Sequence, residues 1–386
     1  MKNANRLSLN KVSKELLFIL DILKENSKNY PSRDINWDLF LDLILHHRLY
    51  SYIYPRIFDK EEFVPQHVIS ILNQLYKQNT FKMLHISGEL DFLNKIFSQN
   101  KIPLIVLKGP VLGKDLYGDI SLRTSSDLDV LVPLKQLLQA ETILEEKGYV
   151  KDDYINTILN DWKWRHHHVT YIHPKKGVKV ELHWRLNPGL GKEPKFNELW
   201  SRKRVSALTK HPIYILGKED LFLFLVMHGG RHGWSRLRWL LDIHQLLKQE
   251  VSWSFVERLL KRNQCLPIGA QALQLSSQIF NSPLIPSLKK LANTRRGVQL
   301  AQKTTFYLEN MVNLHTDPVP EDIANYHSHF LFSIMSWQQK CYYLFSIIHP
   351  LPKDVETLPL PKWLHFLYFP LRPLLWAKRK VNKLSL

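Results

Sequence analysis

The sequence predicts an α+β protein in which a small mixed β-sheet is preceded and followed by helical regions. Three observations predict this class. Leucines recur at helical spacing before residue 100 and again after residue 216. Between these regions, short apolar runs end at turn residues, as strands do. A four-residue connection, Pro174–Gly177, joins two alternating segments and is typical of a hairpin turn.

The 386 residues divide into four regions. Residues 1–100 form an N-terminal helical region, 101–215 an α/β core, and 216–348 a C-terminal helical region. Residues 349–386 hold a Pro-rich linker and a basic, aromatic tail. With 45% hydrophobic and 23% charged residues, the composition is that of a folded globular chain.

Within the α/β core the elements follow one another closely. We expect a buried strand over Ile102–Leu107 and a second one ending at Val130–Val132. A helix over Leu134–Lys147 follows, and the glycine after it is a typical helix stop. Two further strands, about His166–His173 and Val178–Leu186, form the hairpin.

The net charge limits the classes of partner that the protein is expected to bind. With 53 Lys+Arg against 35 Asp+Glu, the formal net charge is +18. Such an excess favours a polyphosphate, a nucleic acid or an anionic lipid, although it equally serves solubility. The two cysteines cannot build a disulfide framework. No stretch reaches the ~20 apolar residues of a spanning helix, and the first ten residues lack the apolar core of a signal peptide. We therefore expect a reduced, cytoplasmic protein.

The first candidate for chemistry is the sequence Asp127-Leu128-Asp129. Strand side chains alternate, so the two carboxylates share one face about 7 Å apart. They repel each other there, and removing one should cost little stability. A bound Mg²⁺ would relieve the repulsion, because it takes carboxylate oxygens together with water and phosphate oxygens. The alternative is a strand that ends in a solvated acidic turn.

A third carboxylate changes the balance between these two interpretations. Val178–Trp184 alternates so that Glu181 and His183 lie on its polar face. With a four-residue hairpin loop, Thr170 faces Glu181 and His168 faces His183. Glu181 on a neighbouring strand completes a cluster able to hold two metal ions, which stabilise the attacking and leaving oxygens in phosphoryl transfer.

Upstream, Leu107-Lys108-Gly109-Pro110 closes a strand and opens a helix. Gly109 permits a close backbone approach, and Pro110 suits the first helical position. The helix N-terminus would offer N–H groups to a triphosphate, and Lys108 would add a charge. The alternative is an ordinary strand-to-helix turn.

These residues together resemble the uncharacterised nucleotidyltransferases of the DNA polymerase beta-like superfamily, over roughly residues 102–247. The matching segments are LKGPVLGKDLYGDISLRTSSDLDVLV (Leu107–Val132), VKVELHWRL (Val178–Leu186) and HGGRHGWSRLRWLLDIHQLL (His228–Leu247). The resemblance implies a small mixed sheet that carries three metal-binding carboxylates. By position, Asp127, Asp129 and Glu181 are expected to be both the catalytic residues and the metal ligands.

The implied reaction moves a nucleoside monophosphate from NTP to an acceptor and releases pyrophosphate, with Mg²⁺ or Mn²⁺ in a two-metal site. The acceptor is a small molecule, a peptide, a protein or a nucleic acid end, and neither the NTP nor the oligomeric state follows from the sequence. The alternative is a catalytically inactive module of the same fold that binds a polyanion, either RNA or an anionic membrane surface.

Six residues are expected to bind the nucleotide: Lys108, Gly109, Arg123, His183, His228 and Arg236. Arg123 can clamp a phosphate or form a salt bridge to Asp119 or Asp127. His228 and Arg236 belong to a segment in which Gly229-Gly230 is expected to break the helix and line the cleft, with Asp242 supporting an arginine.

The tail has an unusual composition. Pro361–Leu386 holds six basic residues, no acidic one, and interleaved aromatic residues that include Trp363, Phe366 and Trp376. Such a segment suits peripheral contact with an anionic membrane. Pro370 and Pro373 interrupt any long helix. A C-terminal arm packed on the body would explain the same residues.

Overall fold

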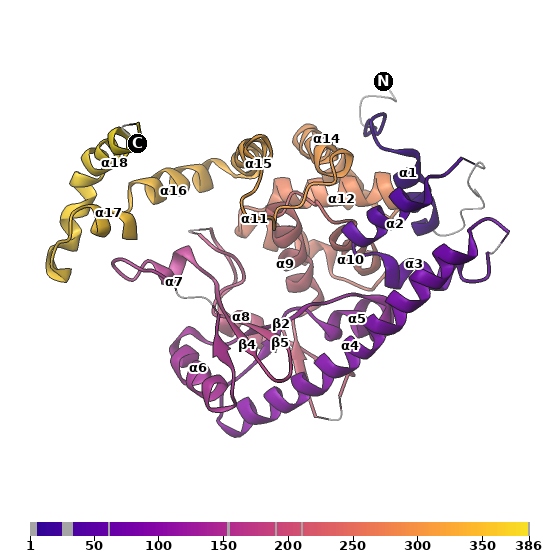
Figure 1. Ribbon diagram of the computed structural model, residues 1–386, viewed down its shortest axis with the longest axis horizontal. Helices are drawn as coiled ribbons and strands as arrows, with labels where there is room; N and C mark the ends of the chain where they lie inside the picture. The colour runs from indigo at the N-terminus through magenta and orange to yellow at the C-terminus, as the bar shows by residue number, and fades with distance from the viewer. Residues whose placement is uncertain are drawn as a thin grey trace.

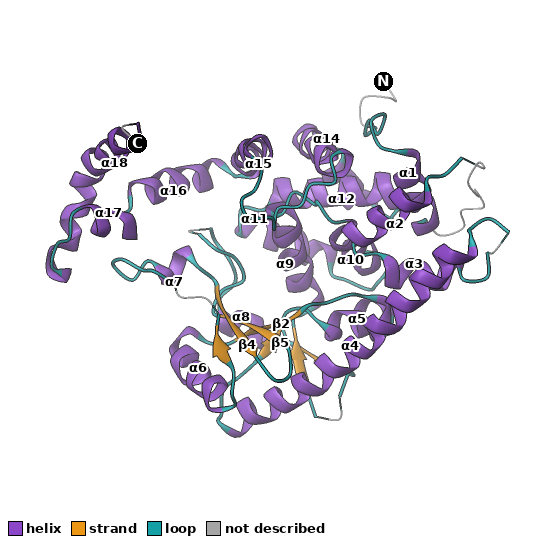
Figure 2. Cartoon of the chain, viewed as in Figure 1, coloured by secondary structure: helices purple, strands orange, loops and turns teal. Residues whose placement is uncertain are grey.

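The computed structural model describes residues 6–24, 34–60, 62–152, 155–189, 191–209 and 211–384, with residues 380–384 described by backbone alone. Figure 1 shows three parts: a sheet with the long helix α4 along one side, a layer of helices above it, and an arm of C-terminal helices. Figure 2 shows how few of the residues are in strands. The α+β class is confirmed.

The described residues form one mixed sheet of seven strands in the order β3-β4-β5-β2-β1-β7-β6. At its centre, β2 runs parallel to β5 and antiparallel to β1. The hairpin β4–β5 has the predicted register. The strands are β1 Ile105–Val106, β2 Asp127–Leu131, β3 Val150–Lys151, β4 His168–His173, β5 Val178–His183, β6 Arg204–Ser206 and β7 Ile213–Ile215.

The two faces of the sheet have different partners. Leu128, Val130 and Val180 pack into a core with α4 (Gln66–Gln99) and α6 (Leu137–Glu146). Alternate residues on the central strands therefore point the other way, toward the helical layer. Asp129 and Glu181 lie on that second face, because they are the register partners one position away from Leu128 and Val180.

The helical layer contains helices from the first part of the chain and from the part that precedes the arm. Its core contains apolar residues from α1 to α4 and from α9 to α15, together with Ile105, Leu107 and Leu131 of the sheet region. The predicted division at residues 100, 215 and 348 stays a prediction. The remaining helices before the arm are α1 Lys14–Leu23, α2 Trp37–His46, α3 Tyr50–Ile57, α5 Pro110–Tyr117, α7 Trp162–Arg165, α8 Phe196–Ser201, α9 Lys218–Arg231, α10 Leu237–Leu246, α11 Trp253–Arg262, α12 Leu266–Phe280, α13 Pro286–Ala292, α14 Arg295–Glu309 and α15 Glu321–Ile334.

The C-terminal arm, residues 337–384, extends from the helical layer (Figure 1). It consists of α16 Trp337–Ile348, α17 Pro352–Thr357, a 3-10 turn at Lys362–Leu367 and α18 Tyr368–Leu384. The proline-rich stretch predicted as a linker thus contains α17. The expectation that Pro370 and Pro373 interrupt a long helix is wrong, because α18 runs through both. No helix in the described ranges has the length and apolar character needed to cross a membrane.

Sequence and structure differ mainly at the sheet margins. The first strand is shorter than predicted, Ile105–Val106 rather than Ile102–Leu107. The short strands β3, β6 and β7 have no counterpart in the prediction. Each has only two or three residues, which is too few for an alternation of polar and apolar side chains to be recognised.

Candidate functional site

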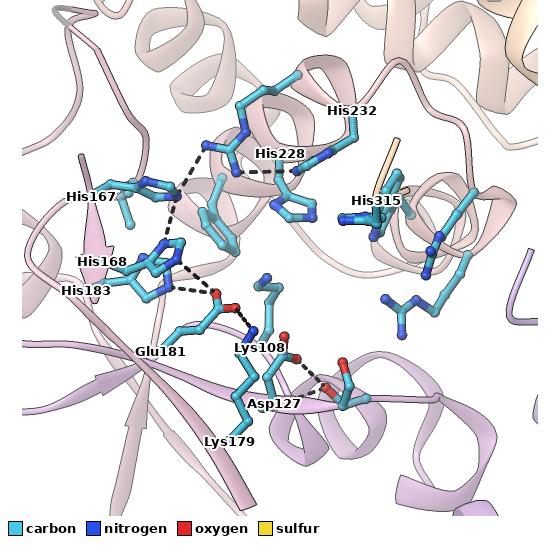
Figure 3. Close-up of a pocket in the computed structure, with 18 of the residues that line it drawn as sticks. Lys108, Asp127, His167, His168, Lys179, Glu181, His183, His228, His232 and His315 are labelled. Atoms are coloured by element: carbon cyan, nitrogen blue, oxygen red, sulfur yellow. Dashed lines mark hydrogen bonds and ion pairs between the residues drawn. The ribbon is translucent and has the colours of Figure 1, made fainter. Parts of the chain in front are cut away.

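A cavity of about 650 Å³ lies between the polar face of the sheet and helices α9 and α10. Figure 3 shows Asp127 and Glu181 on its sheet side, opposite His228, His232 and His315. The described residues that line it include seven lysine and arginine side chains but only two carboxylates. The cations are Arg48, Lys108, Arg123, Lys179, Arg231, Arg236 and Arg238.

The carboxylates come from the two central parallel strands. Asp129 on β2 is the register partner of Glu181 on β5, so both project from the same face. Asp127, two residues before Asp129, lies on this face as well and lines the cavity. Possible ligand atoms of Asp129, Glu181 and His183 all lie within 4.8 Å of one another. The prediction that Asp129 and Glu181 share one face is confirmed. Asp127 is not in this close group, so its convergence with the other two on shared metal ions stays a prediction.

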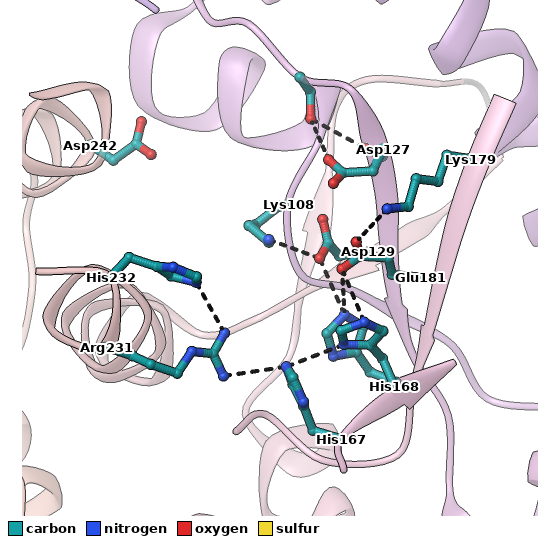
Figure 4. A network of polar contacts seen from close by, with 12 residues as sticks. Lys108, Asp127, Asp129, His167, His168, Lys179, Glu181, Arg231, His232 and Asp242 are labelled. Carbon is teal, nitrogen blue, oxygen red and sulfur yellow. Dashed lines mark hydrogen bonds and ion pairs between the residues drawn. The ribbon is translucent and has the colours of Figure 1, made fainter. Parts of the chain in front are cut away.

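Asp129 is fully buried and strongly paired. Its Oδ1 lies 2.8 Å from Lys108 Nζ and 3.2 Å from His183 Nε2 (Figure 4). Leu107 N–H donates a hydrogen bond to the Asp129 carbonyl oxygen, and this β1–β2 pairing brings Lys108 beside the carboxylate. The expectation that Asp129 mainly suffers repulsion is wrong, because a lysine and a histidine already stabilise its charge.

The surroundings of the second Asp129 oxygen indicate that a metal ion fits this site. Oδ2 is buried and has no hydrogen-bond partner in the described residues. A carboxylate oxygen left without a donor is costly in the protein interior. A divalent cation would satisfy it, and the carboxylate oxygens of this face are the ligands that Mg²⁺ and Mn²⁺ prefer. The residues present therefore fit the metal that the sequence predicts.

Glu181 sits among cationic and histidine side chains. His183 Nε2 lies 3.6 Å and Lys179 Nζ 3.3 Å from its oxygens, and His168 Nε2 lies 4.0 Å away. Burial favours the neutral form of Glu181, but the hydrogen bond with His183 and the positive charge of Lys108 outweigh it and lower its pKa. Glu181 is therefore ionised at neutral pH and able to bind a cation.

The histidines differ in charge. Burial alone would lower the pKa of His183, but hydrogen bonds to Asp129 and Glu181 outweigh burial and raise it. Burial lowers the pKa of His168 to about 4, and the neighbouring His183 adds to this. Burial likewise lowers the pKa of His167, His228 and His232. These four side chains are neutral at pH 7.

Pro110 has the predicted structural role, whereas Gly109 is needed for its backbone conformation and its close approach to a ligand stays a prediction. Gly109 has φ = 91°, a left-handed conformation that favours glycine. Pro110 occupies the first position of α5. The chain turns here between β1 and α5. The side chain of Lys108, at the start of this turn, lines the cavity.

Arg123 has a partner that the sequence did not suggest. Its Nε and Nη2 donate to the two oxygens of Asp242 on α10, both at 2.9 Å, and both side chains are buried. The predicted salt bridge to Asp119 or Asp127 is therefore wrong, whereas the supporting role predicted for Asp242 is confirmed. Arg123 also lines the cavity, but its guanidinium already binds a carboxylate.

The expected helix break at Gly229-Gly230 is also wrong. α9 continues through both glycines to Arg231. A Cβ at Gly229 would lie 2.2 Å from the Trp234 ring, and one at Gly230 would lie 2.4 Å from Ile268 Cγ2. Tertiary packing rather than chain flexibility thus explains the pair, and the unbroken helix carries His228 and Arg231 into the cavity.

Three arginines of the helical wall contact only neutral groups. Arg231 lies 3.3 Å from His167 Nε2 and 3.5 Å from His232 Nε2. Arg238 donates to the carbonyl oxygen and the hydroxyl of Thr124, and its Nε has no partner. Arg236 donates to Asn313 Oδ1 at 3.5 Å. No carboxylate forms an ion pair with these guanidiniums in the described part of the chain.

These unpaired charges are costly for the folded protein. Burial lowers the pKa of Arg231 to about 10 and that of Arg238 to about 9, and it also lowers the pKa of Arg236 to about 10. A buried cation without a counter-charge is destabilising unless a ligand supplies that charge. The wall is therefore suited to an anion with several oxygens.

All predicted site residues lie in or beside this cavity. Lys108, Asp127, Glu181, Arg123, His183, His228 and Arg236 line it, Asp129 is buried beneath it, and Gly109 adjoins Lys108. Arg231 was not among the residues predicted from the sequence. Its signal was present, since Arg231 follows His228 by three residues and shares its helix face, but the expected break concealed it.

Three comparisons with known proteins complete the description. A family model described as "uncharacterised nucleotidyltransferase" matches residues 33–281. None of the curated proteins compared with the chain is significantly similar to it. Among solved structures, the crystal structure of the lincosamide antibiotic adenylyltransferase LnuA with lincomycin bound is 18% identical, with a TM-score of 0.28. That match covers 36% of this chain and 84% of the other, and at this TM-score it supports no argument about substrate.

Proposed function

The chain belongs to a family of uncharacterised nucleotidyltransferases, and we propose that it transfers a nucleoside monophosphate from NTP to an acceptor in a metal-dependent reaction. Asp127, Asp129 and Glu181 would hold Mg²⁺ or Mn²⁺, in a two-metal site. Pyrophosphate is the second product. Transfer of label from each NTP identifies the preferred nucleotide and the fraction that contains the acceptor.

One observation carries the proposal: the cavity has two walls of opposite chemistry. The sheet wall offers Asp127 and Glu181, and beneath it Asp129 has a buried oxygen without a donor among the described residues. The helical wall offers guanidiniums that pair with no carboxylate of the described ranges. A metal–triphosphate complex matches both walls at once, because its cation meets the carboxylates and its phosphate oxygens meet the arginines.

In this proposal the carboxylates, the residues that hold them and the arginines have different roles. Asp127, Asp129 and Glu181 anchor the cation site, and Lys108 and His183 fix the Asp129 carboxylate. When bound, the metal would stabilise the charge that develops on the attacking and leaving oxygens. Arg231, Arg236 and Arg238 hold the phosphates of the leaving pyrophosphate.

The reaction balances without any further reactant. An acceptor oxygen forms a bond to the α-phosphorus, the bond from that phosphorus to the bridging oxygen breaks, and pyrophosphate leaves with the electron pair. The acceptor loses one proton. His168 lines the cavity beside Glu181, so its imidazole is placed within reach of that proton.

The test compares two positions of the label. The purified chain is incubated with Mg²⁺ or Mn²⁺, a cell extract, and each NTP labelled at either the α or the γ phosphate. We expect an extract component to acquire the α label but not the γ label, and we expect chelation of the metal to stop the transfer. Transfer of the γ label would indicate a kinase and would contradict the proposal.

The variant Asp129→Asn removes one carboxylate charge with little change in the shape of the side chain. We expect it to lower the transfer rate at least about 100-fold, the scale of losing one preorganised electrostatic contact. Asp38→Asn is the control, because Asp38 is exposed on α2, away from the cavity. If NTP binds without metal and no fraction becomes labelled, the inactive polyanion-binding module is the better description.

A further inference from the structure

The C-terminal arm, residues 337–384, presents large apolar side chains to solvent. Trp363 is 75% exposed, Trp337 70% and Phe345 66%. A soluble surface rarely gathers so many large apolar groups without a partner. The exposed large apolar residues of the arm are Trp337, Tyr342, Tyr343, Leu344, Phe345, Ile347, Ile348, Leu358, Trp363, Phe366, Phe369, Leu374 and Trp376.

Helix α16 shows the feature most clearly. Its sequence, WQQKCYYLFSII, has one charged residue, and none of its residues is buried. Four consecutive residues, Tyr342 to Phe345, are exposed. Gln339, Tyr342, Tyr343 and Ser346 line a cavity that α16 shares with Trp164 and Gly189, so this side faces the body. Successive side chains point about 100° apart around a helix, which places Trp337, Leu344 and Ile348 together on the other side, where they are 70%, 54% and 53% exposed. An exposed face made of large apolar side chains normally has a partner.

The arm is nevertheless an ordered structure. Tyr368 and Leu375 are buried with Ile158 in a small core of their own. Asp354 is buried and binds Arg379 Nη1 at 2.7 Å and Arg372 Nη1 at 3.5 Å. The exposed side chains therefore belong to a folded surface and not to a loose end.

The charge of the arm points to an anionic partner. Residues 337–386 contain eight lysine and arginine residues against two acidic ones, Asp354 and Glu356. One of these two acids, Asp354, already binds two arginines within the arm. Basic residues interleaved with tryptophan, tyrosine and phenylalanine are typical of segments that lie in the headgroup region of a membrane.

We propose that the arm docks the protein on an anionic lipid surface, with α16 and the aromatic residues of the 3-10 turn and α18 entering the headgroup boundary. The basic residues that accompany this apolar outer face favour an anionic lipid surface over an apolar protein surface. The docking is peripheral, because no described helix is able to span a membrane. It extends the predicted membrane contact from the tail to α16 and does not depend on the proposed reaction.

The test is co-sedimentation of the full chain with vesicles of phosphatidylcholine, with and without phosphatidylglycerol. The variant is Phe345→Glu with Ile348→Glu, two residues that are 66% and 53% exposed. The control is Phe81→Glu with Leu84→Glu, which are 72% and 55% exposed on α4, away from the arm (Figure 1). Since all four side chains are exposed, both double variants should melt like the parent chain.

We expect binding to the mixed vesicles that the arm variant weakens at least about tenfold and the control leaves unchanged. Added salt should weaken it, because exposed charges are screened. Equal binding by the parent and the arm variant would overturn the proposal, as would equal binding to pure phosphatidylcholine. A stable dimer in analytical ultracentrifugation without vesicle binding would identify a second copy of the chain as the occupant, which also overturns it.

Discussion

At the scale of single residues, Asp129 explains most about the site. Its two oxygens have different surroundings, since Oδ1 receives Lys108 and His183 while Oδ2 has no partner in the described residues. The sequence predicted the carboxylates and the hairpin register, because both follow from alternation along strands. It could not predict that Lys108 pairs with Asp129, because a lysine side chain can reach many positions and only the folded backbone selects one.

Asp129→Ala should therefore destabilise the fold by about 1–3 kcal/mol, since it leaves Lys108 and His183 buried without their acceptor. Asp129→Asn keeps an oxygen at this position and should cost less. Urea unfolding followed by circular dichroism measures both. Equal midpoints for the two variants and the parent chain would show that repulsion and attraction cancel at this site.

Lys108 gives a second prediction at this scale, with two effects of opposite sign. Lys108→Ala removes a positive charge beside the cation site, so Mn²⁺ alone should bind more tightly. The same change removes a cavity cation, so NTP in the presence of metal should bind about tenfold more weakly, as for a lost charge-assisted hydrogen bond. Isothermal titration calorimetry separates the two effects. NTP binding that is equally tight with and without metal would argue against the metal site itself.

At the scale of elements, α9 shows where local preference fails. Two adjacent glycines favour a break in an isolated segment, but the packing of Trp234 and Ile268 against them selects a continuous helix. The continuous helix depends on Ile268, which is distant along the chain. It also depends on Trp234, which packs on α9 only because the chain turns back after Arg231. For the same reason the partner of Arg123 on α10 was not foreseen.

Gly229→Ala tests this packing. The added methyl group would overlap the Trp234 ring, so we expect a loss of about 1–3 kcal/mol in the free energy of unfolding. Gly88→Ala is the matched control, because Gly88 lies on α4 with nothing within 4 Å of the new Cβ. It should stabilise the chain by about 0.5–1 kcal/mol. Thermal or urea melts compare them, and a stabilising Gly229→Ala would contradict the packing argument.

The arginine wall gives the second prediction at this scale. Arg231→Gln keeps a polar side chain but removes a guanidinium that contacts only His167 and His232. We expect the KM for NTP to rise about tenfold and stability to stay equal or increase, because a desolvated charge is lost. Arg258→Gln, at an exposed position on α11, is the control. An unchanged KM would exclude Arg231 from triphosphate binding.

At the scale of the whole molecule, the cavity joins two layers. The carboxylates belong to the sheet and most of the cations to the helices above it, so a bound nucleotide would link the two (Figure 3). The sequence placed the acidic residues in strands and the basic residues in a helical segment. It did not show that the two segments face each other, because that depends on how α9 and α10 cross the sheet.

A ligand that links both layers should raise the melting temperature. At 100 times its Kd, a ligand that binds only the folded state stabilises it by about 2.7 kcal/mol. For a chain of this size that corresponds to a rise of a few degrees. We expect NTP with Mg²⁺ to produce this rise in differential scanning fluorimetry, and NTP with a chelator to produce a clearly smaller one. Equal shifts would indicate that the metal takes no part in binding.

The shared core of the helical layer has a consequence for synthesis of the chain. Apolar residues of α1 to α4 belong to one core with residues as late as Ile334, and the Ser8 N–H donates a hydrogen bond to Gln302. At about 5–20 residues per second, translation from the end of α4 to the end of α15 takes roughly 12–50 s. During that interval the nascent N-terminal helices lack their partners, and their apolar faces are the natural substrate for a ribosome-associated chaperone.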